Sequence, residues 1–487
     1  MPALDNAAIA DRLETLASLL DLGGASTYSV RAYRRAADLV RATPAPIDEL
    51  VRSGRVRDLR GVGRAIEARL RELVETGELA EIEELKAKVG PDLKKRARRR
   101  GRSSRALRLD RARATTDAIA DALGGVAAGD ARRFREQCER LAVVVPAEEP
   151  QAALDRFAAL PQIVIVLERG PDRAVGVTSD GVSIEAVVAP ARRFGTALMQ
   201  ATGSDAYVEA LGTLPDAPDE QGVYRALRLP WLPPELREAS APEVPPPLVA
   251  RPQIRGDLHV HTTWSDGRAS VLEMGEAARD LGYEYLAICD HTPNVGVVPG
   301  LDADAVRRQG EEVARANELL APFRVLHGIE CDILGDGTLD LPDDVLGELD
   351  WVQASVHGGQ RQSREQLTQR TVAAVRHPAV RSISHPQGRI LGHRPPNAVD
   401  LDEVFAACGE TGTAVETNGL PDRLDLSGEL VRAAVAFGVR ITCSTDAHSV
   451  RGLANMELSV GTARRGGATA ADVLNTRPLD ELLRPRG

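Results

Sequence analysis

The C-terminal half of the chain alternates short apolar runs with stretches of helical periodicity. The apolar runs lie at 285–289, 324–329, 351–356, 382–384, 413–416 and 440–444. Runs of this length indicate buried strands, and apolar residues at the spacing of one helix face indicate helices between them. Strands that alternate with helices form a parallel sheet covered by those helices. We therefore predict a barrel-like α/β domain over residues 254–487.

The first 92 residues follow a helical pattern instead. Apolar residues recur at helical spacing near the start, at Ile9, Leu13, Leu16, Leu19 and Leu20. The segment 59–66, with glycines at 61 and 63, then indicates a tight turn that opens a new helix. These features predict a small all-helical domain over residues 1–92.

Two linkers and a mixed domain are predicted between these regions. Residues 94–108 hold nine basic side chains and no acidic one. Such a block is typical of a solvated linker, or of an arm that contacts nucleic acid, and we place it at 93–115. Residues 116–238 combine helical stretches with strand-like runs at 162–167 and 182–188, which indicates an α+β domain. The proline-rich residues 239–253 predict a second, stiff linker.

Charge, cysteine usage and hydropathy narrow the classes of protein. The net charge of -10 argues against a uniformly basic nucleic-acid coat but is compatible with a local basic patch. The five cysteines include no Cys-x-x-Cys pair, so we expect neither a zinc–thiolate site nor a disulfide framework. No apolar run is long enough to cross a bilayer, and the first residues do not resemble a signal peptide. We expect a cytoplasmic protein without a membrane partner.

Histidines and acidic residues gather at the ends of the predicted strands. They are His259, His261, Asp266, His291, Glu330, His357, His385, Asp446 and His448. In a strand, His259 and His261 point to the same face because side chains alternate. Side chains at the C-terminal ends of barrel strands converge on one face of the barrel. The pattern therefore predicts a metal centre with these nine residues as ligands, and hence an enzyme.

Each of these histidines, taken alone, could also be an ordinary core residue. A lone histidine is more often a core residue than a ligand, and we interpret His327, His377 and His393 in that way. Two pairs at i, i+2 spacing with further ligands at other strand ends do not fit this explanation. Nine ligands exceed the coordination of one ion, so we expect two or three divalent ions. Imidazole and carboxylate ligands suit manganese, zinc or iron.

These motifs resemble the PHP (polymerase and histidinol phosphatase) family over about 254–475. The resemblance rests on the His-x-His at 259–261, the Ser-Asp-Gly at 265–267, the Asp-His at 290–291 and the Asp-Ala-His at 446–448. It implies a distorted (β/α)7 barrel that holds up to three metal ions, and phosphoesterase activity. Metal ions lower the pKa of bound water and neutralise phosphate oxygens, which permits hydrolysis at neutral pH.

Polar side chains near the ligands are candidates for substrate binding. Arg389 and Arg394 are candidates because a guanidinium group matches the geometry of a phosphate. Asn418 and Arg423 are further candidates, and ordinary loop positions explain them equally well.

The N-terminal domain resembles the small helical domain of family X DNA polymerases. The matching stretches are 31–36, 59–66 and 76–79. The turn from Gly61 to Gly63 is a helix-hairpin-helix signature, whose amides, with Arg64, would bind a DNA phosphate without reading sequence. A plain turn between two helices is the alternative. The family's Schiff-base lysine aligns with Arg69, which stays protonated, so we expect no lyase activity from this helix.

The middle domain resembles the same polymerase family in degraded form. Segments 193–198 and 202–204 match its palm-to-thumb region, and 229–236 matches its C-terminal end. The family's Asp-x-Asp pair is missing between 130 and 175, and Glu185 stands alone at the third carboxylate position. Asp205 replaces the thumb lysine after Gly203 and Ser204. Nucleotidyl transfer needs carboxylates that hold two magnesium ions, so we predict a non-catalytic, polymerase-like α+β domain.

Together these features favour a metal-dependent phosphoesterase that acts on DNA ends or abasic sites in DNA repair. It would be a 3′-5′ exonuclease, a 3′-phosphatase or an AP endonuclease. Its partner would be gapped, nicked or 3′-ended DNA, bound independently of sequence. A small-molecule phosphatase of the histidinol-phosphatase type is the first alternative, and a non-enzymatic DNA-binding adaptor is the second. The sequence predicts no particular oligomeric state.

Overall fold

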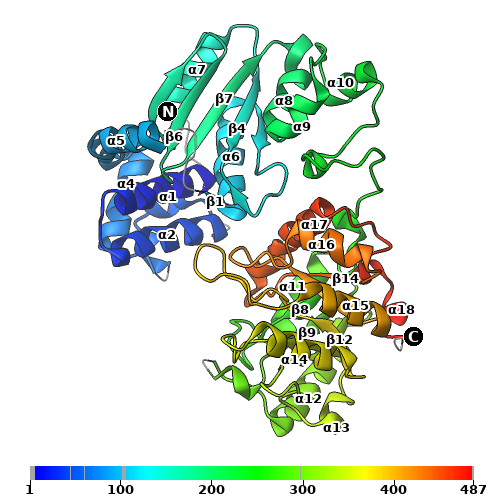
Figure 1. Ribbon diagram of the computed structural model, residues 1–487. Coiled ribbons are helices and arrows are strands. Elements are labelled where there is room, and N and C mark those ends of the chain that lie inside the picture. The colour runs from blue at the N-terminus through cyan, green and yellow to red at the C-terminus, as the bar shows by residue number, and fades with distance from the viewer. Residues whose placement is uncertain (1–5, 44, 60, 101–105, 297, 485–487) are drawn as a thin grey trace. The chain divides into compact units, whose positions relative to one another are not determined.

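Seven parallel strands form the centre of the C-terminal part of the chain in the computed structural model, which describes all residues except 1–5, 44, 60, 101–105, 297 and 485–487 (Figure 1). The strands are β8 (Gly256–Val260), β9 (Tyr285–Ile288), β10 (Arg324–Asp332), β11 (Trp351–Ser355), β12 (Val380–Ile383), β13 (Ala414–Asn418) and β14 (Ile441–Ser444). Each strand pairs with the next one along the chain, and every pair is parallel. β8, β9, β11, β13 and β14 are buried along their whole length, as parallel strands covered on both faces are.

Hydrogen bonds between the first and the last of these strands nearly close the sheet into a barrel. Val260 and Ala447 form a parallel bridge. The amide of His261 donates to the carbonyl of Ala447 at 2.9 Å, and the amide of Asp446 donates to the carbonyl of His259 at 2.9 Å. The predicted (β/α)7 barrel is confirmed, and the closure lies at the residues that were predicted to bind metal.

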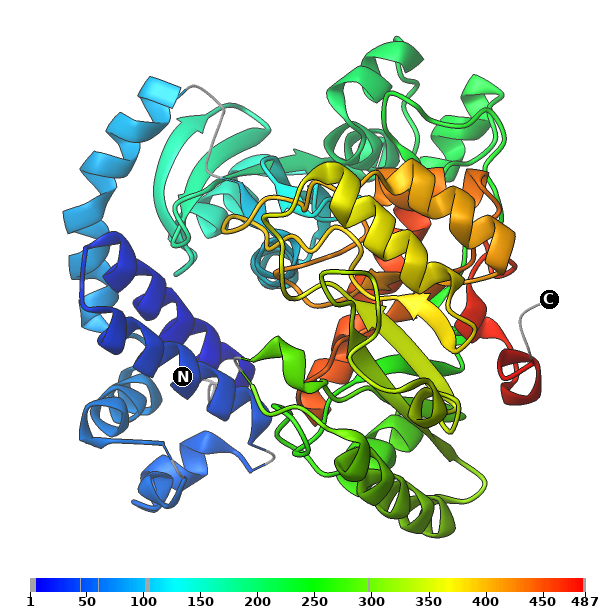
Figure 2. The ribbon, with the colours of Figure 1, turned by 60° about the horizontal axis from the view of Figure 1, so that its bottom comes forward.

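Helices follow the strands and cover the outside of the barrel (Figure 2). They are α11 (Val271–Asp280), α12 (Ala303–Leu320), α13 (Asp343–Leu346), α14 (Arg364–Arg376), α15 (Leu401–Thr411), α16 (Gly428–Ala436) and α17 (Met456–Arg465), with the short α18 (Leu479–Leu482) after them. Ser270 and Glu273 form a capping box at the start of α11, and Asp302 and Asp400 cap α12 and α15. These caps satisfy amides that a helix leaves unbonded at its first turn, which fixes where each helix begins.

A second compact unit contains Met1–Leu107, Arg111–Arg132 and Gln137–Leu229, and the barrel unit contains the rest of the chain. Its helices are α1 (Asn6–Leu22), α2 (Thr27–Ala42), α3 (Ile47–Arg52), α4 (Arg64–Thr76), α5 (Ala80–Arg100), α6 (Leu109–Leu123), α7 (Pro150–Ala159), α8 (Phe194–Thr202), α9 (Asp205–Leu211) and α10 (Glu220–Leu227). Its five-stranded sheet has the order β2 (Val126–Gly129), β4 (Leu141–Pro146), β7 (Ser183–Ala189), β6 (Arg173–Thr178) and β5 (Ile163–Arg169). β4 and β7 are parallel, and the other pairs are antiparallel. Two further strands, β1 (Leu107–Arg108) and β3 (Gln137–Cys138), contain two residues each.

The helical and mixed regions of this unit share a core. Leu13 and Leu70 lie in the same buried cluster as Val177 of β6. The expected linker at 93–115 includes the end of α5 and the first residues of α6, while its residues 101–105 lie outside the described part. The expected linker at 239–253 belongs to the barrel unit, and within it the amide of Val249 donates to the carbonyl of Ala468 at 2.9 Å. Within the described residues, no helix has both the length and the apolar character that a membrane span needs.

Candidate metal centre

The nine predicted ligands all lie at or just beyond the C-terminal ends of barrel strands. His259, at the end of β8, and His261, just after it, are fully buried, and Asp266 follows in the next loop. His291, His357 and His385 come two to three residues after β9, β11 and β12, while Glu330 lies within β10. Asp446 and His448 come just after β14. The strand ends therefore bring all nine side chains to one end of the barrel.

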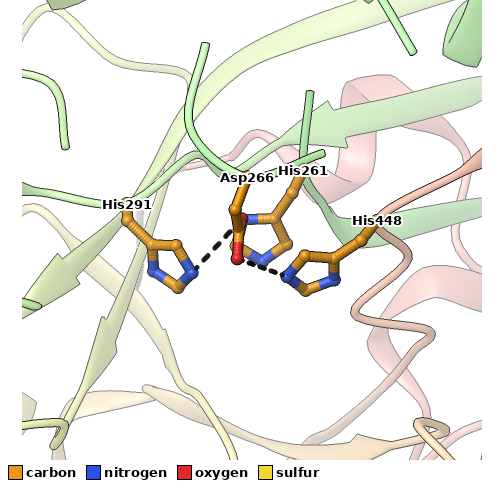
Figure 3. A group of neighbouring side chains, drawn as sticks. All are labelled: His261, Asp266, His291 and His448. Atoms are coloured by element: carbon orange, nitrogen blue, oxygen red, sulfur yellow. Dashed lines mark ion pairs between the residues drawn. The ribbon is translucent and has the colours of Figure 1, made fainter. Parts of the chain in front are cut away.

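Eight of the nine side chains, all except His385, form three overlapping groups, whose ligand atoms lie within 4.8 Å of one another in each group. The outer group is His261, Asp266, His291 and His448; the inner group is His259, His261 and Asp446; the Glu330 group is His291, Glu330 and His357. In Figure 3, Asp266 lies between His291 and His448, at 3.7 Å and 3.2 Å from their Nε2 atoms. The side chain of His448 is 32% exposed and that of Asp266 is 26% exposed, so this group is open to solvent. None of the three groups contains His327, His377 or His393.

Glu330 is the centre of the cluster. Five imidazole nitrogens lie around its carboxylate: His291 Nδ1 and His385 Nε2 at 2.9 Å, His259 Nε2 at 3.5 Å, His357 Nε2 at 3.7 Å and His261 Nε2 at 3.8 Å. No hydrogen bond of acceptable geometry reaches either carboxylate oxygen, and both oxygens are buried. Burying a carboxylate in this way costs free energy unless a cation or donors compensate its charge.

The ligand histidines differ in charge before a metal ion binds. Burial would lower the pKa of His448, but Asp266 and Asp446 raise it to about 9. Neighbouring carboxylates likewise outweigh burial and raise the pKa values of His259 and His291, so a metal ion would displace protons from these three rings. Burial, followed by the neighbouring His448 and His291, lowers the pKa of His261 to about 3, so its ring is neutral at pH 7. Burial by itself would raise the pKa of Glu330, but the surrounding histidines hold that pKa well below its usual value. Neutral imidazoles and ionised carboxylates are the forms that coordinate metal ions. The buried, unbonded oxygens of Glu330 and this donor set therefore fit a centre for first-row divalent ions.

Two of the nine residues have a strained backbone. His385 has a φ of 27° and Asp446 a φ of 53°, in the left-handed region that favours glycine. This conformation costs on the order of 1–3 kcal/mol at a non-glycine residue and is often found at functional sites. Hydrogen bonds hold it in place here, because the amide of His385 donates to Glu416 Oε2 at 2.8 Å and that of Asp446 donates to His259 at 2.9 Å.

Four buried carboxylates behind the ligands were not singled out as site residues from the sequence. They are Asp257, Asp290, Asp332 and Glu416, each with no exposed surface. Asp332 accepts the amide of His357 at 2.9 Å and lies 3.3 Å from Nδ1 of the same ring. Each acid lies within two residues of a ligand or at the end of an apolar run, and that position is the signal that could have identified them.

The four candidate substrate residues differ in how their polar atoms are used. Arg389 is buried, and its guanidinium donates to the carbonyls of Arg423 and Leu424 and pairs with Glu136 of the same unit at 3.0 Å. Asn418 donates to Asp446 Oδ2 at 2.9 Å and accepts the amide of Leu420 at 2.9 Å. The polar atoms of both side chains are therefore bonded to other residues of the protein.

Arg423 and Arg394 have fewer partners. Arg423 Nε lies 3.6 Å from Asp446 Oδ2, and its buried Nη1 has no hydrogen bond. Arg394 donates from Nε to the carbonyl of Gly388 at 2.8 Å. Burial, and then the nearby charge of Arg423, lowers the pKa of Arg394, so two guanidinium groups lie near each other at this end of the barrel.

The glycine turn of the helical region lies at the start of α4. Gly61 has a φ of 108°, which a side chain would strain, and Gly63 is the N-cap residue without a side-chain cap. Gly61, Gly63 and Arg64 are exposed, whereas Val62 between the glycines is buried in the core. The turn therefore presents backbone amides and one arginine to solvent.

In the middle domain, Glu185 lies beside apolar residues. The register of the sheet places Ala142 of β4 on one side of it and Val175 of β6 on the other. Its carboxylate lies 3.6 Å from Nη1 of Arg173. None of the three groups that could hold a metal, among the described residues, includes Glu185 or any other residue of this sheet.

Comparisons with known proteins agree with this architecture. The helix-hairpin-helix domain family matches residues 4–79, and the PHP domain family matches residues 257–385. The chain is 35% identical over 383 residues to the "DNA polymerase/3'-5' exonuclease PolX" of Bacillus subtilis, over 73% of this chain and 67% of the relative. It is also similar to two proteins named "Probable phosphatase". That of Acetivibrio thermocellus is 31% identical over 39% of this chain and 78% of its own length, and that of Syntrophotalea carbinolica is 27% identical over 47% and 93%.

The barrel and its ligand cluster define a hydrolase of the metal-dependent PHP phosphoesterase class, here attached to a helix-hairpin-helix domain. More specifically, the chain belongs to the family X DNA polymerases that carry a C-terminal PHP domain, the family of the Bacillus subtilis relative.

Proposed function

We propose that this chain hydrolyses phosphoesters at DNA ends or abasic sites during DNA repair, as a 3′-5′ exonuclease, a 3′-phosphatase or an AP endonuclease. The observation that carries the proposal is the arrangement of five imidazoles around the buried carboxylate of Glu330, next to a solvent-open group that includes His448. The name of the Bacillus subtilis relative, which includes a 3′-5′ exonuclease, supports a DNA substrate.

Two or three divalent ions would occupy these ligand groups, in which the carboxylate of Glu330 lies near five histidines. Manganese, zinc or iron are the candidates because each accepts imidazole and carboxylate ligands. When bound, such ions would lower the pKa of coordinated water and neutralise phosphate oxygens. The chain's own part is to hold the ligands, to keep Asp446 oriented through Asn418, and to expose the outer group to the substrate.

Arg423 would bind a phosphate oxygen of the substrate. Its Nη1 donor is unbonded, and the side chain lies beside Asp446 of the inner group. Arg394 would assist from the same loop region, because only its Nε is bonded to the nearby backbone. Arg389 and Asn418 would act indirectly, since their polar atoms hold other parts of the site.

The helix-hairpin-helix region would bind gapped, nicked or 3′-ended DNA independently of sequence. The exposed amides at the start of α4 and the guanidinium of Arg64 suit a backbone phosphate and read no base. Binding of this kind weakens steeply as salt rises, because each phosphate contact releases counterions.

This chain would lack two activities of the polymerase family, nucleotidyl transfer and the lyase reaction. Glu185 pairs with Arg173 and has Ala142 and Val175 beside it, so the sheet offers it no second carboxylate in register for magnesium. Arg69, at the position of the lyase lysine, pairs with Glu72 at 2.9 Å and with Glu81. An assay that showed templated nucleotide addition, abolished by Glu185→Ala, would contradict the loss of polymerase activity.

A small-molecule phosphatase is the second candidate function. The two relatives named as probable phosphatases are matched over 39% and 47% of this chain, which favours an activity that needs the barrel alone. The upstream unit would then be a scaffold.

Assays on four substrates distinguish the candidate functions. The purified protein is supplied with manganese and tested on DNA with a labelled 3′ end, on DNA that ends in a 3′-phosphate, on an abasic-site duplex and on histidinol phosphate. We expect turnover of at least one DNA substrate, and its loss in His259→Ala. Rapid hydrolysis of histidinol phosphate with inert DNA would support the small-molecule phosphatase instead. DNA binding without turnover of any substrate would support an adaptor.

A further inference from the structure

The ring of His259 has different neighbours at its two nitrogens. Nδ1 lies 2.8 Å from Oε1 of Glu416. Nε2 lies 3.1 Å from Nε2 of His261, 3.5 Å from Glu330 and 3.8 Å from Asp446. One nitrogen therefore faces a carboxylate behind the site, and the other faces the remaining ligands of the inner group.

Glu416 is held in one orientation. It lies in the middle of β13 with no exposed surface. Besides His259, four donors reach its oxygens: Gln353 Nε2 and the amide of His385 at 2.8 Å, Ser384 Oγ at 3.1 Å and Asn418 Nδ2 at 3.2 Å. These donors come from the middle of β11, from the residues just after β12 and from the end of β13, so the barrel itself fixes the position of the carboxylate.

The side-chain amide of Gln353 cannot replace Glu416 as the acceptor for the ring of His259. Gln353 accepts a hydrogen bond from Trp351 Nε1 through its Oε1 at 3.1 Å. Its NH₂ group is thereby turned toward Glu416 and the ring of His259. Ser384 Oγ lies farther from Nδ1, at 3.3 Å, and it can donate its own proton to Glu416. An ionised carboxylate only accepts hydrogen bonds, so Glu416, at 2.8 Å, is the nearest acceptor for a proton on Nδ1.

We propose that Glu416 is a positioning residue for the metal centre: it keeps the proton of His259 on Nδ1 and leaves the lone pair of Nε2 free for a divalent ion in the inner group. A neutral imidazole carries one N–H, and the partner of one nitrogen decides which form the ring takes. Carboxylates behind metal-bound histidines act in this way in many metalloproteins. The proposal rests on the metal dependence of the proposed function and is independent of its substrate.

In the outer group, the ring of His448 is held by the backbone and not by a carboxylate. Nδ1 of His448 donates to the backbone carbonyl of Asp446 at 2.8 Å. This ring is oriented by the main chain of its own loop. Loss of Glu416 should therefore weaken the ion of the inner group and leave that of the outer group in place.

The test replaces Glu416 with glutamine, which has the same shape but presents an NH₂ group that can donate to Nδ1. Manganese binding to metal-free protein is followed by titration calorimetry, with metal content measured by mass spectrometry. We expect one class of site to lose affinity about 10- to 100-fold while the others are unchanged. Long-range ¹H–¹⁵N NMR of the metal-free protein, at a pH high enough that the ring of His259 carries a single proton, should show His259 change from the Nδ1–H form to the Nε2–H form.

Two further variants separate positioning from folding. Glu416→Asp keeps the charge and should retain an intermediate affinity with the original ring form. Glu238→Gln removes a carboxylate that pairs with Arg133 at 2.9 Å and Arg465 at 2.7 Å but belongs to no ligand group, and it should bind all ions as the unaltered protein does.

The proposal is overturned if Glu416→Gln binds manganese with unchanged affinity at every site. It is also overturned if all sites weaken together with a lower unfolding temperature of the metal-free protein. These outcomes do not depend on hydrolysis. A fully loaded protein that hydrolyses no DNA would contradict the proposed function and leave the role of Glu416 intact.

Discussion

Arg389 and Arg423 show how two arginines near one metal centre acquire different roles. Arg389 has its guanidinium bonded to two backbone carbonyls and to Glu136, whereas Arg423 retains a buried donor without a partner beside Asp446. A buried guanidinium with all its partners stabilises the fold, and one with an unused donor can bind a ligand.

Replacement of Arg423 by alanine should therefore affect catalysis more than stability. We expect kcat/KM to fall about 10- to 100-fold, because a hydrogen bond to a charged group contributes roughly 1.5–3 kcal/mol. Metal content and unfolding temperature should stay close to those of the unaltered protein. Steady-state kinetics on whichever DNA substrate is turned over in the assays on four substrates provide the measurement.

Arg389→Ala is the matched comparison, and we expect the opposite pattern. Removal of one partner from a buried ion pair typically costs about 3 kcal/mol, so urea unfolding should shift clearly toward lower concentration. The residual folded fraction should keep a nearly normal KM. Equal losses of kcat/KM in both variants without loss of stability would contradict this division of roles.

The sequence predicts the ligands better than the residues that support them. His259 and His261 are recognisable because two histidines two residues apart in a strand must share a face. Glu416 has no such partner along the chain, and its role depends on donors from three strands that only folding brings together. For the same reason, the sequence cannot show that Arg389 is bonded to Glu136, more than 250 residues earlier.

At the scale of elements, one acidic side chain joins the helical region to the mixed sheet within their common unit. Asp180, in the turn between β6 and β7, accepts hydrogen bonds from Ser18 of α1 at 3.2 Å and from Arg111 and Thr115 of α6 at 3.0 Å and 3.1 Å. Its side chain is 10% exposed. This network ties α1, α6 and the turn to one another.

Asp180→Ala should destabilise this unit by about 1–3 kcal/mol, because it removes the acceptor of the buried Ser18 hydroxyl and one of the two carboxylates paired with Arg111. Denaturant unfolding followed by circular dichroism measures the loss. Asp155→Ala is the control, since Asp155 forms an exposed pair with Arg169 at 2.7 Å and should change stability by less than about 1 kcal/mol. Similar shifts in the two variants would show that the Asp180 network does not stabilise the unit.

Buried parallel strands and capped helices are predictable as elements because their patterns are local. The end of α5 is less obvious, since the basic block at 94–108 resembles a solvated linker by charge alone. Lysine and arginine nevertheless have high helix propensity, and α5 extends to Arg100. A run of basic side chains therefore does not by itself indicate the absence of a helix.

At the scale of the whole molecule, metal ions should stabilise one of the two units. The three ligand groups all lie in the barrel unit. An ion that binds only the folded state adds stability, by about 2.7 kcal/mol when its free concentration is 100 times its dissociation constant.

A chelator should therefore lower one unfolding transition and leave the other unchanged. Differential scanning calorimetry of the full chain, with manganese and then with EDTA, provides the measurement. In His261→Ala, which removes a residue common to two ligand groups, EDTA should shift that transition much less. A shift of both transitions by the same amount in the unaltered protein would contradict metal binding confined to the barrel.

The closure of the barrel also has a consequence for biosynthesis. Its seam is made by hydrogen bonds of His259, His261 and Asp446 with their partners across β8 and β14, and these strands are the first and last of the seven along the chain. A nascent chain that has not yet released residues 441–448 from the ribosome lacks both the closing strand and two of the nine ligands. Completion of the inner and outer groups must therefore follow synthesis of β14, and premature termination upstream of β14 would leave an open sheet with an incomplete centre.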